Sequence, residues 1–484
     1  MSKTTEHSLS IEPDSNRVIA RPFFPGSAGS DTEPSRLASI VDRILAWPEG
    51  DRARLLTEVR ERSRTRYAQV EATWLRHFEL ARGPLPWLDQ VADGDLRLLI
   101  GAFLTQGYAY EAVALTNPSM VPFGESNGGA LSFIMSARAI GEGHVSSIAF
   151  FTGSVDAAGA VDLDPRSEHV SNGTREFGWV EKESFAVQIE ELDLPAQLIG
   201  RVLESLDDRF SKDDLNRVLN ELSESDVEPA DGIDSIRRVR WLAASNYEIS
   251  FDASSPISEH LLSPGIPIES NGMEDARFVR FVDDDGSVIY YATYTAFDGR
   301  LILPQLIETT DFHHFRIGTL TGPTVHHKGM ALFPRKVEGE YLSLSRHDHE
   351  KTFLMRSDDI HTWSNAEVLF GPERAWELIQ TGNCGSPIET EAGWLVITHG
   401  VGAMRRYVLG AVLLDLDEPA KVLARLDQPL LEPEPTETAG YVPDVVYSCG
   451  SMVHNGFLVL PYGYSDHGIR VMVTQLGQVL DRMT

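Results

Sequence analysis

A short run of charged residues stands where the sequence otherwise predicts a buried strand, in SNGMEDARFVRF at residues 270–281. Glu274, Asp275 and Arg277 follow a turn-forming Asn-Gly pair and precede an alternating apolar run. A carboxyl group placed there could act as a general acid, because partial burial raises its pKa and keeps it protonated. The alternative is an Asp–Arg pair that braces the start of the strand, since most ion pairs are structural. The motif taken alone favours this alternative.

The composition narrows the class of partner. The chain has 484 residues, with 72 Asp and Glu against 42 Lys and Arg, so its net charge is −30. Nucleic acids and anionic membranes bind positive surfaces, so we expect neither as a partner. The start of the chain lacks the apolar core of a signal peptide, and no stretch approaches the ~18 apolar residues of a membrane span. We therefore expect a cytoplasmic protein.

The residue pattern changes along the chain and predicts its domains. Residues 1–35 are polar and contain Pro, Ser and Gly, which indicates a flexible tail. Residues 36–110 have apolar residues three and four apart, which predicts a helical N-terminal domain. Residues 111–484 are typical of strands, with a helical insertion at about 165–236. The helical additions could dock onto a partner, including a second copy of the chain in a homo-oligomer.

The strand-rich region repeats itself. Four segments each combine a short apolar strand, a polar turn with glycine and an aromatic-rich strand, and residues 117–139 look like an earlier fifth copy. The interval of about 55 residues suits a four-stranded propeller blade. We predict a mainly β fold, a five-bladed β-propeller with an N-terminal α-helical domain and a helical insertion after the first blade. The alternative is a β-sandwich whose hairpins are similar by coincidence.

A propeller would gather polar side chains from all repeats at one place, because its innermost strands line a central channel. The corresponding positions of the repeats carry polar groups in Asn117-Pro118-Ser119, Glu274–Arg277, His326–Gly329, Asn383–Ser386 and Pro443-Asp444. The ends of the next strands add Arg138, Arg346, His399 and Asp466. Carboxylates, basic groups and amides would meet in one funnel, which indicates a ligand site.

These segments resemble glycoside hydrolase family 130, the β-mannoside phosphorylases and mannosidases. GMEDARFV resembles the Glu-Asp-Pro-Arg segment of that family, and later blades are matched by KGMALFPRKVEGEYLSLSR, GNCGSPIETEAGWLVITHGV, YVPDVVYSCG and LPYGYSD. The resemblance spans residues 117–484 apart from the helical insertion. It implies a five-bladed propeller that acts on carbohydrates. Because the catalytic acid of the family is the Asp of this segment, it implies that Asp275 is catalytic.

The resemblance also implies the binding residues. For phosphate these are Lys328, Arg346, His399 and Tyr407. For the sugar they are Asn117, Arg138 and Asp466, with Glu274 and Arg277 bracing Asp275 and in reach of the sugar. The family has a further lysine at the phosphate site where this chain has Gln380. Three arginines near in sequence could compensate for the missing charge, namely Arg335, Arg405 and Arg406.

A single essential carboxylate suits an inverting phosphorylase, because phosphate supplies the nucleophile that an inverting hydrolase makes from water with a second carboxylate. Asp275 would have to be protonated in the resting complex. Since pairing with Arg277 would oppose this, we expect Arg277 to hold Glu274 or the end of the strand.

The sequence indicates no metal and no cofactor, and the resemblance implies inorganic phosphate as a co-substrate if the protein is a phosphorylase. The adjacent His326 and His327 would point to opposite faces of a strand and could not readily share an ion. Cys384 and Cys449 stand at equivalent positions of two repeats and are interpreted as small packing residues.

Three hypotheses of function follow. The first is phosphorolysis of β-mannoside oligosaccharides with inversion, which releases α-mannose 1-phosphate. The second, motivated by Gln380, is an inverting β-mannoside hydrolase with the same fold. The third is a non-catalytic carbohydrate-binding or scaffold propeller.

Overall fold

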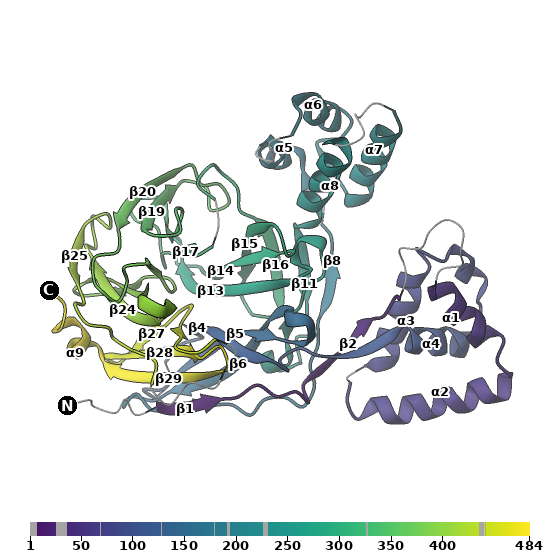
Figure 1. Cartoon of the computed structure of the whole chain (residues 1–484), viewed down its shortest axis with the longest axis horizontal. Coiled ribbons are helices and arrows are strands. Elements are labelled where there is room, and N and C mark those ends of the chain that lie inside the picture. Colours follow the sequence, from purple (N-terminus) through teal and green to yellow (C-terminus); the bar gives the residue numbers. More distant parts are fainter. Residues whose placement is uncertain are drawn as a thin grey trace. The chain divides into compact units, whose positions relative to one another are not determined.

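The computed structural model describes residues 7–25, 36–67, 69–126, 128–178, 180–190, 194–225, 231–325, 328–434, 440 and 442–484. His326 and His327 lie outside the described residues. The chain divides into two compact units, drawn in Figure 1. The larger comprises residues 1–13, 113–166 and 172–484, and the smaller comprises residues 14–112 and 167–171.

The smaller unit is mainly helical. Its helices bury one apolar face each, around a core that includes Leu37, Trp74, Phe78 and Ile100. Its elements are β2 (Val18–Pro22), α1 (Arg36–Leu45), α2 (Glu49–Arg64), α3 (Val70–Ala81), the 3₁₀ turn η1 (Pro86–Gln90), α4 (Gly94–Phe103) and β3 (Thr105–Ala109). Strands β2 and β3 pair with each other in antiparallel fashion.

The larger unit is mainly β, and its described residues contain four sheets of four or more strands. The largest has 11 strands, and nine of them follow the order β4-β5-β6-β13-β14-β15-β16-β11-β8. Of its pairings only β6 with β13, at Ser146 and Gly272, is parallel in the described residues. The strands are β4 (Ala114–Pro122), β5 (Leu131–Ile140), β6 (Ser146–Val155), β7 (Val161–Leu163), β8 (Thr174–Glu176), β11 (Tyr247–Ser250), β12 (Leu261–Leu262), β13 (Gly272–Val282), β14 (Val288–Phe297), β15 (Ile302–Thr309) and β16 (His314–Thr319).

The other three sheets follow in the order of the sequence. One consists of β17 (Ala331–Leu332), β18 (Tyr341–Ser345), β19 (Thr352–Ser357) and β20 (Asn365–Phe370). The next contains β21 (Gln380–Asn383), β22 (Ile388–Thr390), β23 (Gly393–Val401), β24 (Tyr407–Leu414) and β25 (Val422–Arg425). The last contains β26 (Val446–Tyr447), β27 (Met452–His454), β28 (Phe457–Tyr464), β29 (Gly468–Gln475) and β1 (His7–Ile11), and helix α9 (Leu476–Leu480) follows it.

The predicted flexible tail over residues 1–35 is wrong for the parts that form β1 and β2. Strand β1 pairs with β29, where Leu9 lies opposite Val471 and Ile11 opposite Ile469. The backbone groups of this polar stretch are satisfied by a partner strand at the other end of the chain. Local composition does not predict such a pairing.

A helical segment interrupts the larger unit, and Figure 1 shows its helices gathered together in teal. They are α5 (Lys182–Glu190), α6 (Ala196–Glu204), α7 (Lys212–Ser225) and α8 (Asp231–Ala244), with the short strands β9 (Val180–Glu181) and β10 (Arg209–Phe210). The last helix continues beyond residue 236, where the insertion was predicted to end, because Val239, Leu242 and Ala243 extend its buried face.

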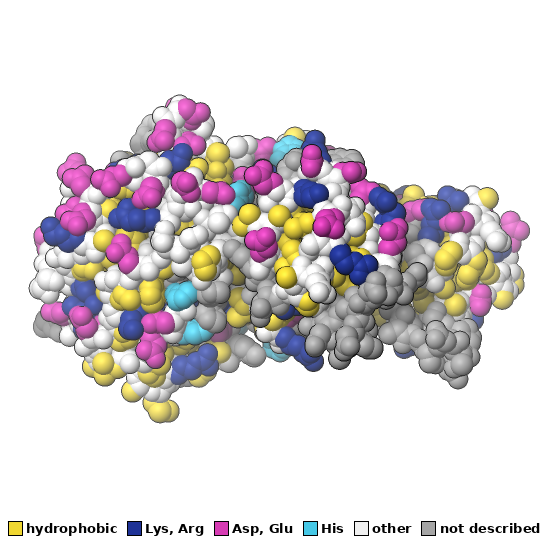
Figure 2. All heavy atoms as spheres, turned by 90° about the horizontal axis from the view of Figure 1, so that it is seen from above, with side chains coloured by type: hydrophobic (Ala, Val, Ile, Leu, Met, Phe, Trp, Pro, Cys, Tyr) yellow, Lys and Arg dark blue, Asp and Glu magenta, His cyan; other side chains and the backbone are white. Residues whose placement is uncertain are grey.

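On the face drawn in Figure 2, Asp and Glu side chains are spread over the described surface with Lys and Arg between them. The acidic excess of the chain is therefore distributed on this face. Within the part of the chain that the structure describes, no helix is long and apolar enough to cross a membrane.

Candidate active site

Two strands carry the same backbone irregularity. In β13 the pairing with β14 shifts between Glu274 and Arg277, and in β4 the pairing with β5 shifts around Asn117. The residues within these irregularities, Asp275 and Asn117, have positive φ angles of 57° and 49°. Bulges redirect side chains, and positive φ is uncommon for residues other than glycine. The two side chains meet, and Asn117 Nδ2 donates to Asp275 Oδ1 at 2.5 Å.

Glu274 binds two cations. Arg138 Nη2 donates to its Oε1 and Lys328 Nζ donates to its Oε2, each at 2.5 Å. Arg138 also donates from Nε to Ser146 Oγ at 2.8 Å, and its Nη1 lies 3.4 Å from Asp275 Oδ1. Arg138 thus ties β5 to the starts of β6 and β13. Lys328, predicted at the phosphate site, is held by Glu274 in this structure.

Arg277 is buried and holds backbone groups. Its Nη1 donates to the carbonyl of Asp275 and its Nε to the carbonyl of Cys384, both at 2.8 Å, and its Nη2 donates to Tyr447 Oη at 3.1 Å. From the sequence we expected Arg277 to hold either Glu274 or the end of the strand. In the structure it holds the end of the strand, through the carbonyl of Asp275. Arg277 therefore fixes the backbone from which the Asp275 side chain projects.

From the sequence we expected burial to raise the pKa of Asp275 and keep its carboxyl group protonated. The structure indicates the opposite shift. Burial alone would raise its pKa, but the charges of Arg138, Arg277 and Lys328 and the hydrogen bond from Asn117 outweigh burial and lower the pKa to about 2. Without substrate, Asp275 is therefore a carboxylate at neutral pH. Arg277 lies on the same strand as Asp275, but Arg138 comes from β5 and Lys328 from the segment before β17, so the local sequence around Asp275 predicts only part of their combined effect.

The pKa of Asp466 shifts in the opposite direction and is raised above its usual value. Burial raises its pKa, and the negative charge of Asp275 adds to this effect, while Arg138 and Arg405 oppose it. Asp466 lies in the turn between β28 and β29 and has a φ of 45°, which is uncommon for a residue other than glycine. Its electrostatic interaction with Arg138 and Asp275 places it beside the group that contains the catalytic candidate.

A second group surrounds His399 on β23. Arg346 Nη1 and the amide nitrogen of Gln380 each lie 3.0 Å from His399 Nε2. With its amide reversed, Gln380 turns its oxygen to Arg346 and His399 and donates to the His349 carbonyl at 3.2 Å. Burial and the charges of Arg346 and Arg277 hold the pKa of His399 well below its usual value, so the imidazole is neutral.

Glycine is required opposite His399. Gly382 pairs with it across β21 and β23, and a Cβ on Gly382 would lie 2.7 Å from His399 Cε1 and 3.2 Å from Arg346 Cδ. Any larger residue would push these two side chains away from the site.

Two tyrosines enclose the imidazole. The ring of Tyr407 stacks on the His399 ring, with centroids 6.2 Å apart and an angle of 12° between the ring planes. The centroid of the Tyr447 ring lies 5.0 Å from that of His399. Because Tyr447 also accepts from Arg277, it joins the His399 group to the Asp275 group.

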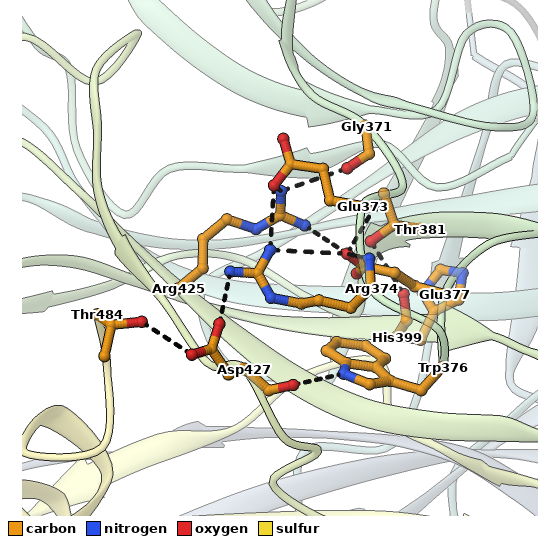
Figure 3. Close-up of polar contacts among 10 residues, drawn as sticks. All are labelled: Gly371, Glu373, Arg374, Trp376, Glu377, Thr381, His399, Arg425, Asp427 and Thr484. Atoms are coloured by element: carbon orange, nitrogen blue, oxygen red, sulfur yellow. Dashed lines mark hydrogen bonds and ion pairs between the residues drawn. The ribbon is translucent and has the colours of Figure 1, made fainter.

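A buried ion pair anchors the loop that enters this site, as Figure 3 shows. Glu377 is fully buried, and its Oε1 accepts from Arg425 Nη2 at 2.9 Å and from two backbone N–H groups of the loop. Trp376 Nε1 donates to the carbonyl of Asp427 at 3.0 Å, and the indole packs against the strand that carries His399. The next strand, β21, begins at Gln380, so this anchoring sets the position of its amide.

The predicted site residues therefore lie in two linked groups. The first contains Asn117, Arg138, Glu274, Asp275 and Lys328, and the second contains Arg346, Gln380, His399 and Tyr407. Arg277 connects them through Tyr447. Sequence analysis missed Tyr447 and Ser146. Tyr447 stands within the matched segment YVPDVVYSCG, so its place in the repeat could have identified it.

The described residues contain no group of three or more His, Cys, Asp or Glu side chains that could hold a metal ion. Cys384 and Cys449 are buried and free, and burial raises the pKa of the Cys384 thiol to about 12. A thiol with so high a pKa is a poor nucleophile at neutral pH.

Comparison with known proteins identifies the class to which this fold and site belong. A family model described as beta-1,4-mannooligosaccharide phosphorylase, of glycoside hydrolase family 130, matches residues 246–484. A 1,2-beta-oligomannan phosphorylase of Thermoanaerobacter sp. (strain X514) is 33% identical over 250 residues, which cover 50% of this chain and 81% of the relative. A beta-1,2-mannobiose phosphorylase of the same organism is 33% identical over 248 residues, 50% of this chain and 80% of the relative.

Among solved structures, the beta-1,2-mannobiose phosphorylase of Listeria innocua in complex with beta-1,2-mannobiose matches with a TM-score of 0.45 and 20% identity. The match covers 76% of this chain and 92% of that protein. The sequence matches are sufficient for the assignment. The chain belongs to glycoside hydrolase family 130.

Proposed function

We propose that the protein is an inverting β-mannoside phosphorylase, which cleaves β-mannosidic linkages with inorganic phosphate and releases α-mannose 1-phosphate. Family membership and the two phosphorylase relatives support the reaction class. The observation that carries the proposal is the carboxylate of Asp275, held by Asn117 and Arg138 beside the Arg346–His399 group. One group offers an acid and the linked group offers an anion site.

The proposed architecture is the five-bladed propeller. The 11-stranded sheet is held together at its middle by one parallel pair, between Ser146 and Gly272. Division at that point yields two antiparallel groups of strands, which with the other three sheets make five. In this arrangement the bulges at Asn117 and Asp275 occupy equivalent places on innermost strands.

In the proposed reaction a phosphate oxygen forms a bond to the anomeric carbon as the bond to the glycosidic oxygen breaks on the opposite face. The Asp275 proton goes to the departing oxygen, directly or through a sugar hydroxyl. Because the pKa of Asp275 is about 2 without ligand, the carboxyl must gain a proton when the substrates bind. A phosphate anion near Arg277 would offset one of the charges that lower the pKa of Asp275, and its own negative charge would raise that pKa further.

Residue roles in this proposal follow the contacts. Asn117 and Arg138 orient Asp275 and face the mannosyl hydroxyls together with Asp466, while Glu274 and Arg277 brace the acid. Arg346, His399, Gln380 and Tyr407 receive phosphate, and Lys328 is in reach of both substrates. No cofactor is needed. The cytoplasmic location and a homo-oligomeric state stay predictions.

The second candidate is an inverting β-mannoside hydrolase, which Gln380 favours because a neutral amide stands in the anion site. Incubation with β-1,2- and β-1,4-mannobiose, with and without inorganic phosphate, separates the two. We expect turnover only with phosphate. Equal turnover without phosphate would support the hydrolase, and no turnover of any mannoside together with measurable sugar binding would support a binding module.

A further inference from the structure

The anion site contains few free positive charges. His399 is neutral, Gln380 is an amide, and Lys328 donates to Glu274. Arg346 is thus the cation in direct contact with His399. A phosphate dianion is bound best by several converging cations and N–H groups, so one guanidinium leaves the site short of positive charge.

Of the three arginines that could compensate, two are engaged elsewhere. Arg335 donates to both carboxylate oxygens of Glu389 at 2.8 and 2.9 Å. Arg406 donates to Glu432 at 2.6 Å and to the carbonyl of Pro433. Both therefore have carboxylate partners outside the two groups of the site.

Arg405 is placed differently. Its guanidinium carbon lies 5.9 Å from the centroid of Tyr407, the ring that stacks on His399. It stands in the turn between β23 and β24 with a φ of 58°, and the preceding Met404 has the same φ. Among the described residues, no hydrogen bond or ion pair engages its guanidinium. Its positive charge also acts on Asp466, which lies beside the Asp275 group.

We propose that Arg405 is a further phosphate-binding residue, which supplies from the β23–β24 turn the charge that Gln380 lacks. This inference rests on the proposed phosphorylase function. The guanidinium over Tyr407 would close on a phosphate bound against Arg346 and His399 and form charge-assisted hydrogen bonds with it. Its planar donors suit a phosphate oxygen pair.

The test compares Arg405→Ala with Arg406→Ala, its neighbour in the same turn, and with Arg405→Lys. Losing a charge-assisted contact should raise the KM for phosphate by about tenfold or more in Arg405→Ala. The KM for the mannoside and kcat at saturating phosphate should change little. Arg405→Lys should restore part of the phosphate affinity, and Arg406→Ala should retain the wild-type KM for phosphate.

Titration calorimetry with inorganic phosphate makes the test independent of turnover, and Arg405→Ala should weaken binding by the same factor. Unchanged phosphate affinity in Arg405→Ala would overturn the inference, as would a rise confined to the KM for the mannoside. If the wild type cleaves mannosides at the same rate without phosphate, the proposed function itself fails. Phosphate-dependent wild-type turnover with an unaffected Arg405→Ala enzyme removes only the role of Arg405.

Discussion

Asn117 donates a 2.5 Å hydrogen bond to Asp275 across 158 residues of sequence, and both residues adopt positive φ within strands. The irregularities in β4 and β13 therefore both contribute to this one hydrogen bond. Such conformations persist only where the surrounding structure enforces them, and they are common at functional sites. Arg277 enforces one of them by holding the Asp275 carbonyl.

Replacing Asp275 by Asn should abolish most catalysis. The amide keeps the size of the side chain and can still accept from Asn117, but it has no proton to transfer. We expect kcat to fall by about 10²- to 10⁴-fold, the usual contribution of general acid catalysis. Steady-state kinetics measures the loss, and circular dichroism checks that the variant is folded. A folded variant with the wild-type rate would show that Asp275 is only a brace.

The same residue should make stability depend on pH at the acid end. The folded-state pKa of Asp275 is lowered from 3.8 to about 2, so ionised Asp275 stabilises the folded state above pH 4. This contribution, on the order of 2 kcal/mol, is lost as the pH falls from about 4 to about 2. Urea unfolding of wild type and Asp275→Asn at several pH values measures it. The free energies of unfolding should converge as the pH falls, and a constant difference would refute the lowered pKa.

The loop that precedes Gln380 depends on the buried pair of Glu377 and Arg425. Arg425→Ala leaves the buried Glu377 carboxylate with only Arg374, at 3.9 Å, as a cation, so we expect a loss of about 3 kcal/mol in the free energy of unfolding. Glu373→Ala is the matched control, because Glu373 also contacts Arg425 but its side chain is 66% exposed. Its replacement should cost less than about 0.5 kcal/mol. Equal losses in the two variants would argue against this anchoring.

Gln380→Lys tests the anion site by adding the missing charge. A lysine beside Arg346 should tighten phosphate binding and lower the KM for phosphate several-fold. Without phosphate, repulsion between the two cations should lower the melting temperature, and saturating phosphate should reverse this. Thermal unfolding with and without phosphate measures the effect. Gln380→Met, of similar size and no charge, lacks this repulsion, so phosphate should raise its melting temperature by less than that of Gln380→Lys.

Part of this picture could be predicted from the sequence. The repeats place Asn117, Arg138 and Asp275 at positions that meet, and the structure brings their side chains into contact. The pKa of Asp275 could not be predicted from the local sequence, because two of the three cations that lower it, Arg138 and Lys328, are distant in the chain. The pairing of β1 with β29 also joins opposite ends of the chain, and Ser146 takes its role only through its hydrogen bond from Arg138. These features depend on tertiary contacts that leave no local pattern.

The identity of the first product distinguishes inverting phosphorolysis from hydrolysis in a single experiment. Proton and phosphorus NMR during cleavage of β-1,2-mannobiose in phosphate buffer distinguishes α-mannose 1-phosphate from free mannose released at the cleaved bond. We predict α-mannose 1-phosphate formed together with an equal amount of mannose from the acceptor side. Two equivalents of mannose and no sugar phosphate would contradict the account.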